Sequence, residues 1–154
     1  KLSFTSFPNI TLNIKEKSPW VMVISNNKSN LYSEDGVLLN QKLNDFELPN
    51  TSILIIKALV EISKNNQIMP DYLTTIHDLF LNLNNVPFLN IQQVILDQSN
   101  IKLIKDNGLK INLGEKDQLE EKFAMLRYFL GDHRDNIDHV EFIDIQFPKR
   151  VIIK

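Results

Sequence analysis

The sequence contains no cysteine, and only four glycines and three histidines occur among its 154 residues. Without cysteine, the chain has no disulfide, no zinc–thiolate centre and no thiol nucleophile. Few glycines and histidines are also unfavourable for an active site, because phosphate-binding loops use glycine and acid–base catalysis most often uses histidine. These absences predict a protein without enzymatic activity.

Basic excess and long apolar runs are missing as well. The 17 Lys and Arg residues are outnumbered by 19 Asp and Glu residues, which argues against nucleic-acid binding. No apolar run approaches the ~18 residues that span a bilayer, and no signal peptide is visible. Because the chain opens at Lys1 without methionine, we expect a trimmed or processed chain, with any membrane anchor of its parent upstream.

What is present is the composition of a folded domain, at 43% hydrophobic and 23% charged residues. Residues 9–16 alternate between apolar and polar side chains, which predicts a half-buried strand. Residues 2–7 and 19–25 also have strand character. Residues 30–40 predict a hairpin that turns at Asp35-Gly36.

The middle of the chain predicts two helices. Residues 51–66 place apolar side chains at helical spacing after a candidate N-cap, Thr51 or Ser52. Residues 70–85 begin with proline, which is favoured in the first turn of a helix.

Strands then return at residues 91–98 and in a hairpin over residues 101–114. A third helix is predicted from Asp117, where Glu120 would complete a capping box. Two last strands end at Phe147 and cover residues 150–153. Because most neighbouring strands are joined by tight turns, we expect an α+β fold, with a largely antiparallel sheet and helices on one face.

Two segments are candidate sites of chemistry. The strand–glycine–helix junction at Gly114 fails as a phosphate loop, because this glycine stands alone and the next residue, Glu115, would repel an anion. The segment 131–139 favours a solvated loop over a metal site. The candidate metal ligands of that segment are Asp132, His133, Asp135, Asp138 and His139.

Three segments in order resemble one family. They are "FPNITLNIKEKSPWVMV", "LYSEDGVLL" and the pair "IKLIKDNGLKINLGEKDQLEEKFAMLRYFL" and "VEFIDIQFPKRVIIK". This combination resembles the extracytoplasmic region of the bacterial cell-division proteins FtsQ and DivIB. The resemblance is carried by roughly residues 7–40 and 100–154.

The resemblance implies a single-pass cell-membrane protein whose transmembrane helix lies outside this chain. Residues 1–24 would be the last strands of a truncated POTRA domain, and residues 25–154 would be the β domain on the extracytoplasmic face. The family implies a non-enzymatic divisome scaffold with no cofactor or metal. It also implies that FtsB-like and FtsL-like proteins bind by adding a strand to the last β-strand.

Carried onto this sequence, the partner-binding positions are Phe147, Lys149, Arg150, Val151, Ile152 and Ile153. The chain departs from the family at Gln146 and Glu115, positions where the family has or can have arginine. We therefore expect Lys149 and Arg150 to supply the positive charge instead. Two alternatives stay open: a POTRA-type module of a polypeptide-transport or outer-membrane assembly protein, and a small metal-dependent hydrolase that uses His133 and His139.

Overall fold

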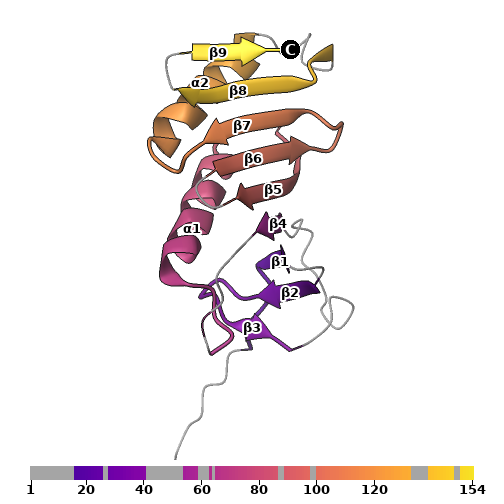
Figure 1. Ribbon diagram of the computed structural model, residues 1–154, viewed down its shortest axis with the longest axis vertical. Helices are drawn as coiled ribbons and strands as arrows, with labels where there is room; N and C mark the ends of the chain where they lie inside the picture. The colour runs from indigo at the N-terminus through magenta and orange to yellow at the C-terminus, as the bar shows by residue number, and fades with distance from the viewer. Residues whose placement is uncertain are drawn as a thin grey trace, which may run out of the picture.

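The computed structural model describes residues 16–25, 28–40, 54–58, 63, 65–86, 89–97, 100–132, 139–147 and 150–154. These residues form one twisted sheet with two helices (Figure 1). The predicted α+β class is confirmed. The strands are β1 (Val21–Ser25), β2 (Lys28–Tyr32), β3 (Leu38–Leu39), β4 (Leu54–Ala58), β5 (Ile91–Asp97), β6 (Asn100–Lys105), β7 (Lys110–Gly114), β8 (Phe142–Phe147) and β9 (Arg150–Ile153), and the helices are α1 (Pro70–Asn84) and α2 (Leu119–Asp132).

The described strands lie in the order β3-β2-β1-β4-β5-β6-β7-β8-β9. The pairs β1–β2, β2–β3, β5–β6, β6–β7 and β8–β9 are antiparallel. The pairs β1–β4, β4–β5 and β7–β8 are parallel. Helix α1 lies between β4 and β5 in the chain, and α2 connects β7 to β8, as crossovers between parallel strands require.

The core lies between the helices and one face of the sheet. Successive side chains of a strand point to opposite faces, so the fully buried Val94, Leu103, Ile111 and Ile143 of adjacent strands line a single face. Helix α1 buries Ile76 and Leu79 against this core, and α2 buries Phe123 and Leu126. In Figure 1 both helices lie behind or beside the sheet, and its other face is turned to the viewer.

The predicted helix over residues 51–66 is wrong in its described part, because residues 54–58 form the strand β4. Ile55, Ile56 and Ala58 lie between two parallel neighbours, β1 and β5. A central parallel strand carries a nearly continuous apolar run, and this run happens to contain residues at helical spacing as well. The proposed N-caps Thr51 and Ser52 lie outside the described residues.

The two predicted hairpins are confirmed, and each uses a glycine with positive φ at its turn: Gly36 at 75° and Gly108 at 89°. The first strand of the described chain, predicted within residues 19–25, is also confirmed as β1. The strand predicted over residues 9–16 and the one over residues 2–7 lie outside the described residues except for Glu16.

Helix α2 begins two residues later than predicted, at Leu119. The carboxylate of Asp117 does not act as the expected cap but accepts a hydrogen bond of 3.2 Å from Lys122 Nζ. Lys122 is only 1% exposed, and its Nζ also donates to the backbone oxygen of Glu115 at 2.7 Å. Through these two hydrogen bonds, the buried side chain of Lys122 links helix α2 to the β7–α2 loop.

Strand β1 spans the expected domain boundary at residues 24 and 25, and it pairs with β2 and β4 in the same sheet. Residues 1–15 of the predicted POTRA segment lie outside the described residues, so the division into domains stays a prediction. Within the described part of the chain, no helix has the length and apolarity to cross a membrane.

Candidate protein-binding edge

Most of the predicted partner-binding residues lie in or next to β9, the last strand in the order of the sheet. Phe147 ends β8 and is 61% exposed, while Ile152 and Ile153 in β9 are 38% and 44% exposed. Arg150 is exposed, and Val151 packs partly against the core. Lys149 and Pro148 lie outside the described residues. The edge thus combines an anchored strand with accessible apolar side chains.

The direction of the backbone groups in β9 follows from its pairing with β8. Phe142 and Lys154 exchange two hydrogen bonds, with Phe142 N donating at 3.1 Å and Lys154 N donating at 3.0 Å. In an antiparallel ladder the bonded pairs alternate with non-bonded pairs, and Ile143 faces Ile153 as the next pair. The N–H and C=O of Ile153 therefore point away from β8, and those of Val151 follow by the same alternation.

The opposite edge of the sheet is occupied. The outer side of β3 receives the turn around residues 63–68, because Leu38 N donates to Asn66 O at 3.3 Å. Val37 and Gln67 form an antiparallel bridge beside it. Within the described residues, β9 pairs only with β8. The β9 edge can therefore accept a further strand, whereas the β3 edge is occupied.

Gln146 and Glu115, the two positions where the family has or can have arginine, lie at one corner of the sheet beside this edge. Gly114, with φ of 66°, allows the close approach of β7 to Gln146 on β8, and Glu115 follows directly. Gln146 is held through Asp144, whose Oδ1 accepts from Gln146 N at 3.0 Å. This corner therefore carries carboxylates and an amide instead of guanidinium groups. Asp144 is not among the residues predicted from the sequence, although an Asp two residues before its backbone donor is a recurrent local motif.

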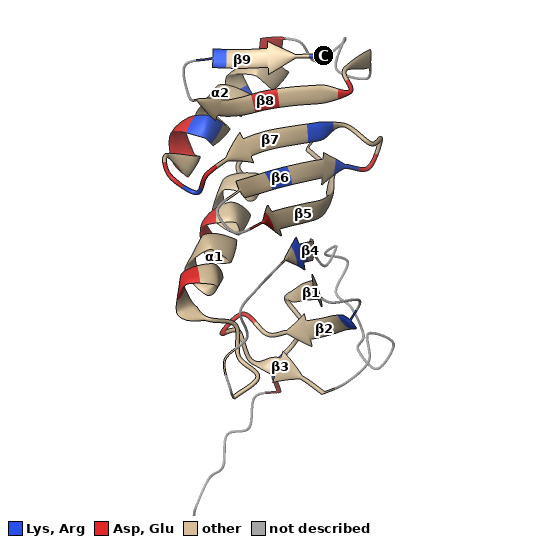
Figure 2. Ribbon diagram, in the orientation of Figure 1, with Lys and Arg blue, Asp and Glu red and all other residues tan. Residues whose placement is uncertain are grey.

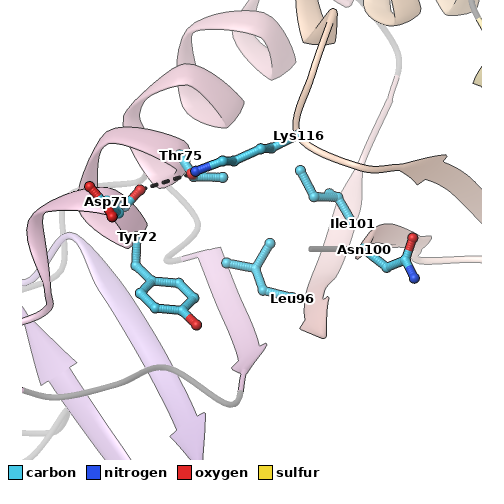
Figure 3. Close-up of a pocket in the computed structure, with 7 residues that line it drawn as sticks. All are labelled: Asp71, Tyr72, Thr75, Leu96, Asn100, Ile101 and Lys116. Carbon is cyan, nitrogen blue, oxygen red and sulfur yellow. Dashed lines mark hydrogen bonds between the residues drawn. The ribbon is translucent and has the colours of Figure 1, made fainter. Parts of the chain in front are cut away.

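A cavity of about 260 Å³ lies between the start of α1, the adjoining ends of β5 and β6, and the β7–α2 loop (Figure 3). Buried Leu96 and Ile101 contribute apolar surface, and polar side chains stand around it. Thr75 Oγ1 donates to the carbonyl oxygen of Asp71 at 2.9 Å, so this hydroxyl is engaged within its own helix. Among the described residues that line the cavity, no free nucleophile stands next to a base.

The other candidates for chemistry have structural explanations or lie outside the described residues. The ring of His77 lies against that of Trp20 at a tilt of 31°, with ring centroids 4.5 Å apart, and its Nε2 lies 3.0 Å from the backbone oxygen of Glu34. His133, Asp135 and Asp138 lie outside the described residues. Among the residues that are described, no group of three His, Cys, Asp or Glu side chains is arranged to hold a metal.

Comparison with known proteins gives one family. The profile described as "Cell division protein FtsQ/DivIB, C-terminal" matches residues 22–146, which is most of the chain. The match begins within β1 and ends in β8, so it covers both helices and the strands up to β8, while β9 lies beyond its last matched residue. A search among curated proteins found no match.

Proposed function

Because the chain belongs to the FtsQ/DivIB family of bacterial cell-division proteins, we propose that its β9 edge binds an FtsB-like or FtsL-like partner by strand addition. The family is one of membrane-anchored, non-enzymatic scaffolds of the divisome. The observation that carries the proposal is the outward direction of the Ile153 backbone groups, on the edge opposite the occupied one.

Strand addition replaces the hydration of these backbone groups by a new ladder of hydrogen bonds. Side chains on alternate positions of β9 then select the partner. Val151 and Ile153 lie on the face shared with the core residue Ile143, while Ile152 faces the same side as Asp144. The exposed ring of Phe147 lies at the end of β8 where the partner strand would pass.

The charge that guides the partner is proposed to come from Lys149 and Arg150, because Gln146 and Glu115 cannot provide it. Arg150 faces Phe147 across the β8–β9 pair, close to the entry of the edge. A charged side chain at such a rim affects the association rate and the salt dependence more than the final affinity.

The proposal also extends to the parent protein. We propose that residues 25–154 are the extracytoplasmic β domain, that residues 1–24 close a POTRA domain, and that one transmembrane helix precedes them. These statements rest on the family. A reporter enzyme that is active only outside the cytoplasm, fused after Lys154 of the full-length protein, tests the orientation: an inactive fusion contradicts it.

The strand-addition test substitutes Ile153 by proline. Proline removes an N–H that makes no bond to β8, and its ring obstructs an incoming strand, so the fold is retained while the ladder is blocked. We expect calorimetric affinity for a peptide of the FtsB-like partner to fall about tenfold or more, since one hydrogen bond contributes about 1 kcal/mol before the steric clash.

Ile153→Thr is the matched control, because it keeps the N–H and the β-branch while losing apolar surface. It should bind within about threefold of the unsubstituted chain. Equal affinities of the proline and threonine variants would contradict strand addition at β9.

Reversal of charge at both Lys149 and Arg150 should slow association of the partner peptide, and Lys116→Glu is the control. An unchanged association rate would show that Lys149 and Arg150 do not supply the steering charge.

A further inference from the structure

The face of the sheet opposite the helices carries a regular pattern of lysines and apolar side chains. On strands β4 to β6, Lys57, Ile95 and Lys102 are direct cross-strand neighbours. At the other end of the face, Lys110, Phe142 and Lys154 are neighbours in the same way. Each triplet places an apolar side chain between two lysines, and we name the surface that holds both triplets the open face.

The apolar part of the open face is only half covered. Ile55, Ile95, Ile104 and Phe142 are all of intermediate exposure, although their strand neighbours on the other face are fully buried. Gln93 lies between Ile55 and Ile104, and its Nε2 is buried without a hydrogen-bond acceptor. Among the described residues, this region thus resembles one layer of a core without a second layer over it.

The charge of the open face contrasts with that of the rest of the molecule. Lys57, Lys102, Lys110 and Lys154 are exposed, and none forms an ion pair with another described residue. Among the paired positions of this face, the acidic side chains are Asp97, two residues after Ile95 on β5, and Asp144 on β8. Figure 2 shows blue segments on β4, β6 and β7, whereas red segments gather on α1 and at the start of α2.

The helix side carries the opposite balance, so the low net charge hides a segregation of charges. Acidic side chains there include Asp71, Asp78, Glu115, Asp117, Glu120, Glu121 and Asp132. The basic ones on α1, α2 and the loop before α2 are Lys116, Arg127 and the buried Lys122. An acidic partner is therefore attracted to the open face and repelled by the helix side.

The spacing of the triplets indicates the shape of the partner. Neighbouring strands are about 4.8 Å apart, so the two lysines of one triplet stand about 10 Å apart across the strands. An α-helix with its side chains is about 10–12 Å wide. A helix laid along β5 would rest an apolar stripe on Ile95 and bring acidic side chains on both flanks to Lys57 and Lys102.

We propose that the open face between β4 and β6 is a docking surface for an acidic amphipathic helix of another protein. The helix completes the missing layer over Ile55, Ile95 and Ile104, and the flanking lysines fix its orientation by charge. The site is separate from the β9 edge, because three strands of the sheet lie between β6 and the free side of β9. The proposal goes beyond the proposed function, and it does not depend on strand addition.

The test uses the 154-residue chain and a designed helical peptide with a leucine stripe flanked by glutamates. A second peptide has the same composition, with the leucines spread around the helix. Amide shifts in NMR spectra should concentrate on β4, β5 and β6 with the first peptide, and its affinity should exceed that of the second by about tenfold or more.

The double variant Lys57→Glu and Lys102→Glu should lower the affinity for the first peptide by about tenfold or more. The double variant Lys57→Gln and Lys102→Gln should lower this affinity less. The control reverses Lys116 and Arg127 on the helix side and should leave the affinity unchanged. Circular dichroism verifies that each variant is folded, and Ile153→Pro should bind the peptide normally even if strand addition fails.

Three results would overturn the proposal. One is equal binding of the two peptides, which would show general attraction of anions. Another is a set of NMR amide shifts on the helix side, or a peptide affinity that is unchanged when Lys57 and Lys102 are both replaced by glutamate. The last is a chain that does not bind the peptide but binds phosphatidylglycerol vesicles, or associates with itself on ultracentrifugation, in a way that depends on Lys57 and Lys102.

Discussion

The backbone of Gly114 lies so close to Gln146 that a β-carbon on the glycine would be 2.7 Å from Gln146 Cβ and 3.2 Å from its Cα. Gly114 also has a φ of 66°, which disfavours other residues. Gly114→Ala should therefore destabilise the chain by about 2–4 kcal/mol in urea unfolding, from backbone strain plus the clash.

Gly108→Ala is the matched control for this substitution. Gly108 has a φ of 89°, but nothing lies within 4 Å of its added β-carbon. Its cost should be limited to backbone strain of about 1–2 kcal/mol. Pairing Gly114→Ala with Gln146→Gly should recover part of the loss. If the two alanine variants were equally unstable, the contact with Gln146 would have no energetic role.

Lys122 supplies both packing and a hydrogen bond to the β7–α2 loop. Lys122→Ala should reduce the free energy of unfolding by about 2–3 kcal/mol, because the aliphatic stem and the bond to Glu115 O are lost together. Lys122→Met keeps the stem and should cost about 1 kcal/mol. Asp117→Ala should lie within about 0.5 kcal/mol of the unsubstituted chain, since its side chain is 63% exposed. If the methionine variant were as unstable as the alanine variant, the aliphatic stem of Lys122 would not contribute separately from its hydrogen bond.

Asp35 should contribute a small acid-sensitive component of stability. Hydrogen bonds from Lys17 and then Ser33 lower the pKa of the Asp35 carboxyl below its ordinary 3.8. A carboxyl whose pKa is depressed on folding contributes fully above its unfolded pKa, and the contribution is lost as the pH falls through the folded value. The melting temperatures of the unsubstituted chain and Asp35→Asn should therefore differ most above about pH 5 and converge below 3.8. A gap that is constant with pH would exclude this role.

Residues 54–58 offer a direct test of strand against helix. Ile56 is completely buried and its neighbour Lys57 is exposed. Ile56→Ala should cost about 2–5 kcal/mol of unfolding free energy, while Lys57→Ala should change it by about 0.5 kcal/mol or less. Comparable losses at Ile56 and Lys57 would be inconsistent with the alternation of β4.

The same segment shows where prediction from sequence ends. The hairpin glycines Gly36 and Gly108 and the initial proline of α1 are local signals, and each identified its element correctly. Strand β4 has no such local signal, because its identity depends on β1 and β5, which come from distant parts of the chain. An apolar run of this length is compatible with either structure until its neighbours are known.

For the candidate edge, the sequence predicted the final strand and its exposure near a chain end, but not which backbone groups of β9 are available. That depends on the register of Phe142 with Lys154. Likewise, Asp117 had the right spacing for a cap, but the buried amine of Lys122 competes for its carboxylate. The open face was not predicted, because its lysines come from different strands and meet only through the register of the sheet.

The turn that covers β3 has a consequence for assembly. With Leu38 N bonded to Asn66 O, two chains cannot join β3 to β9 and extend into a fibre. Pairing between edge strands of the described sheet is then left to β9 against β9, which gives a closed pair with two-fold symmetry. Such a pair would use the same outward groups of Ile153 that a partner strand needs. Self-pairing and partner binding would then compete, and the concentration of the chain would set which complex forms.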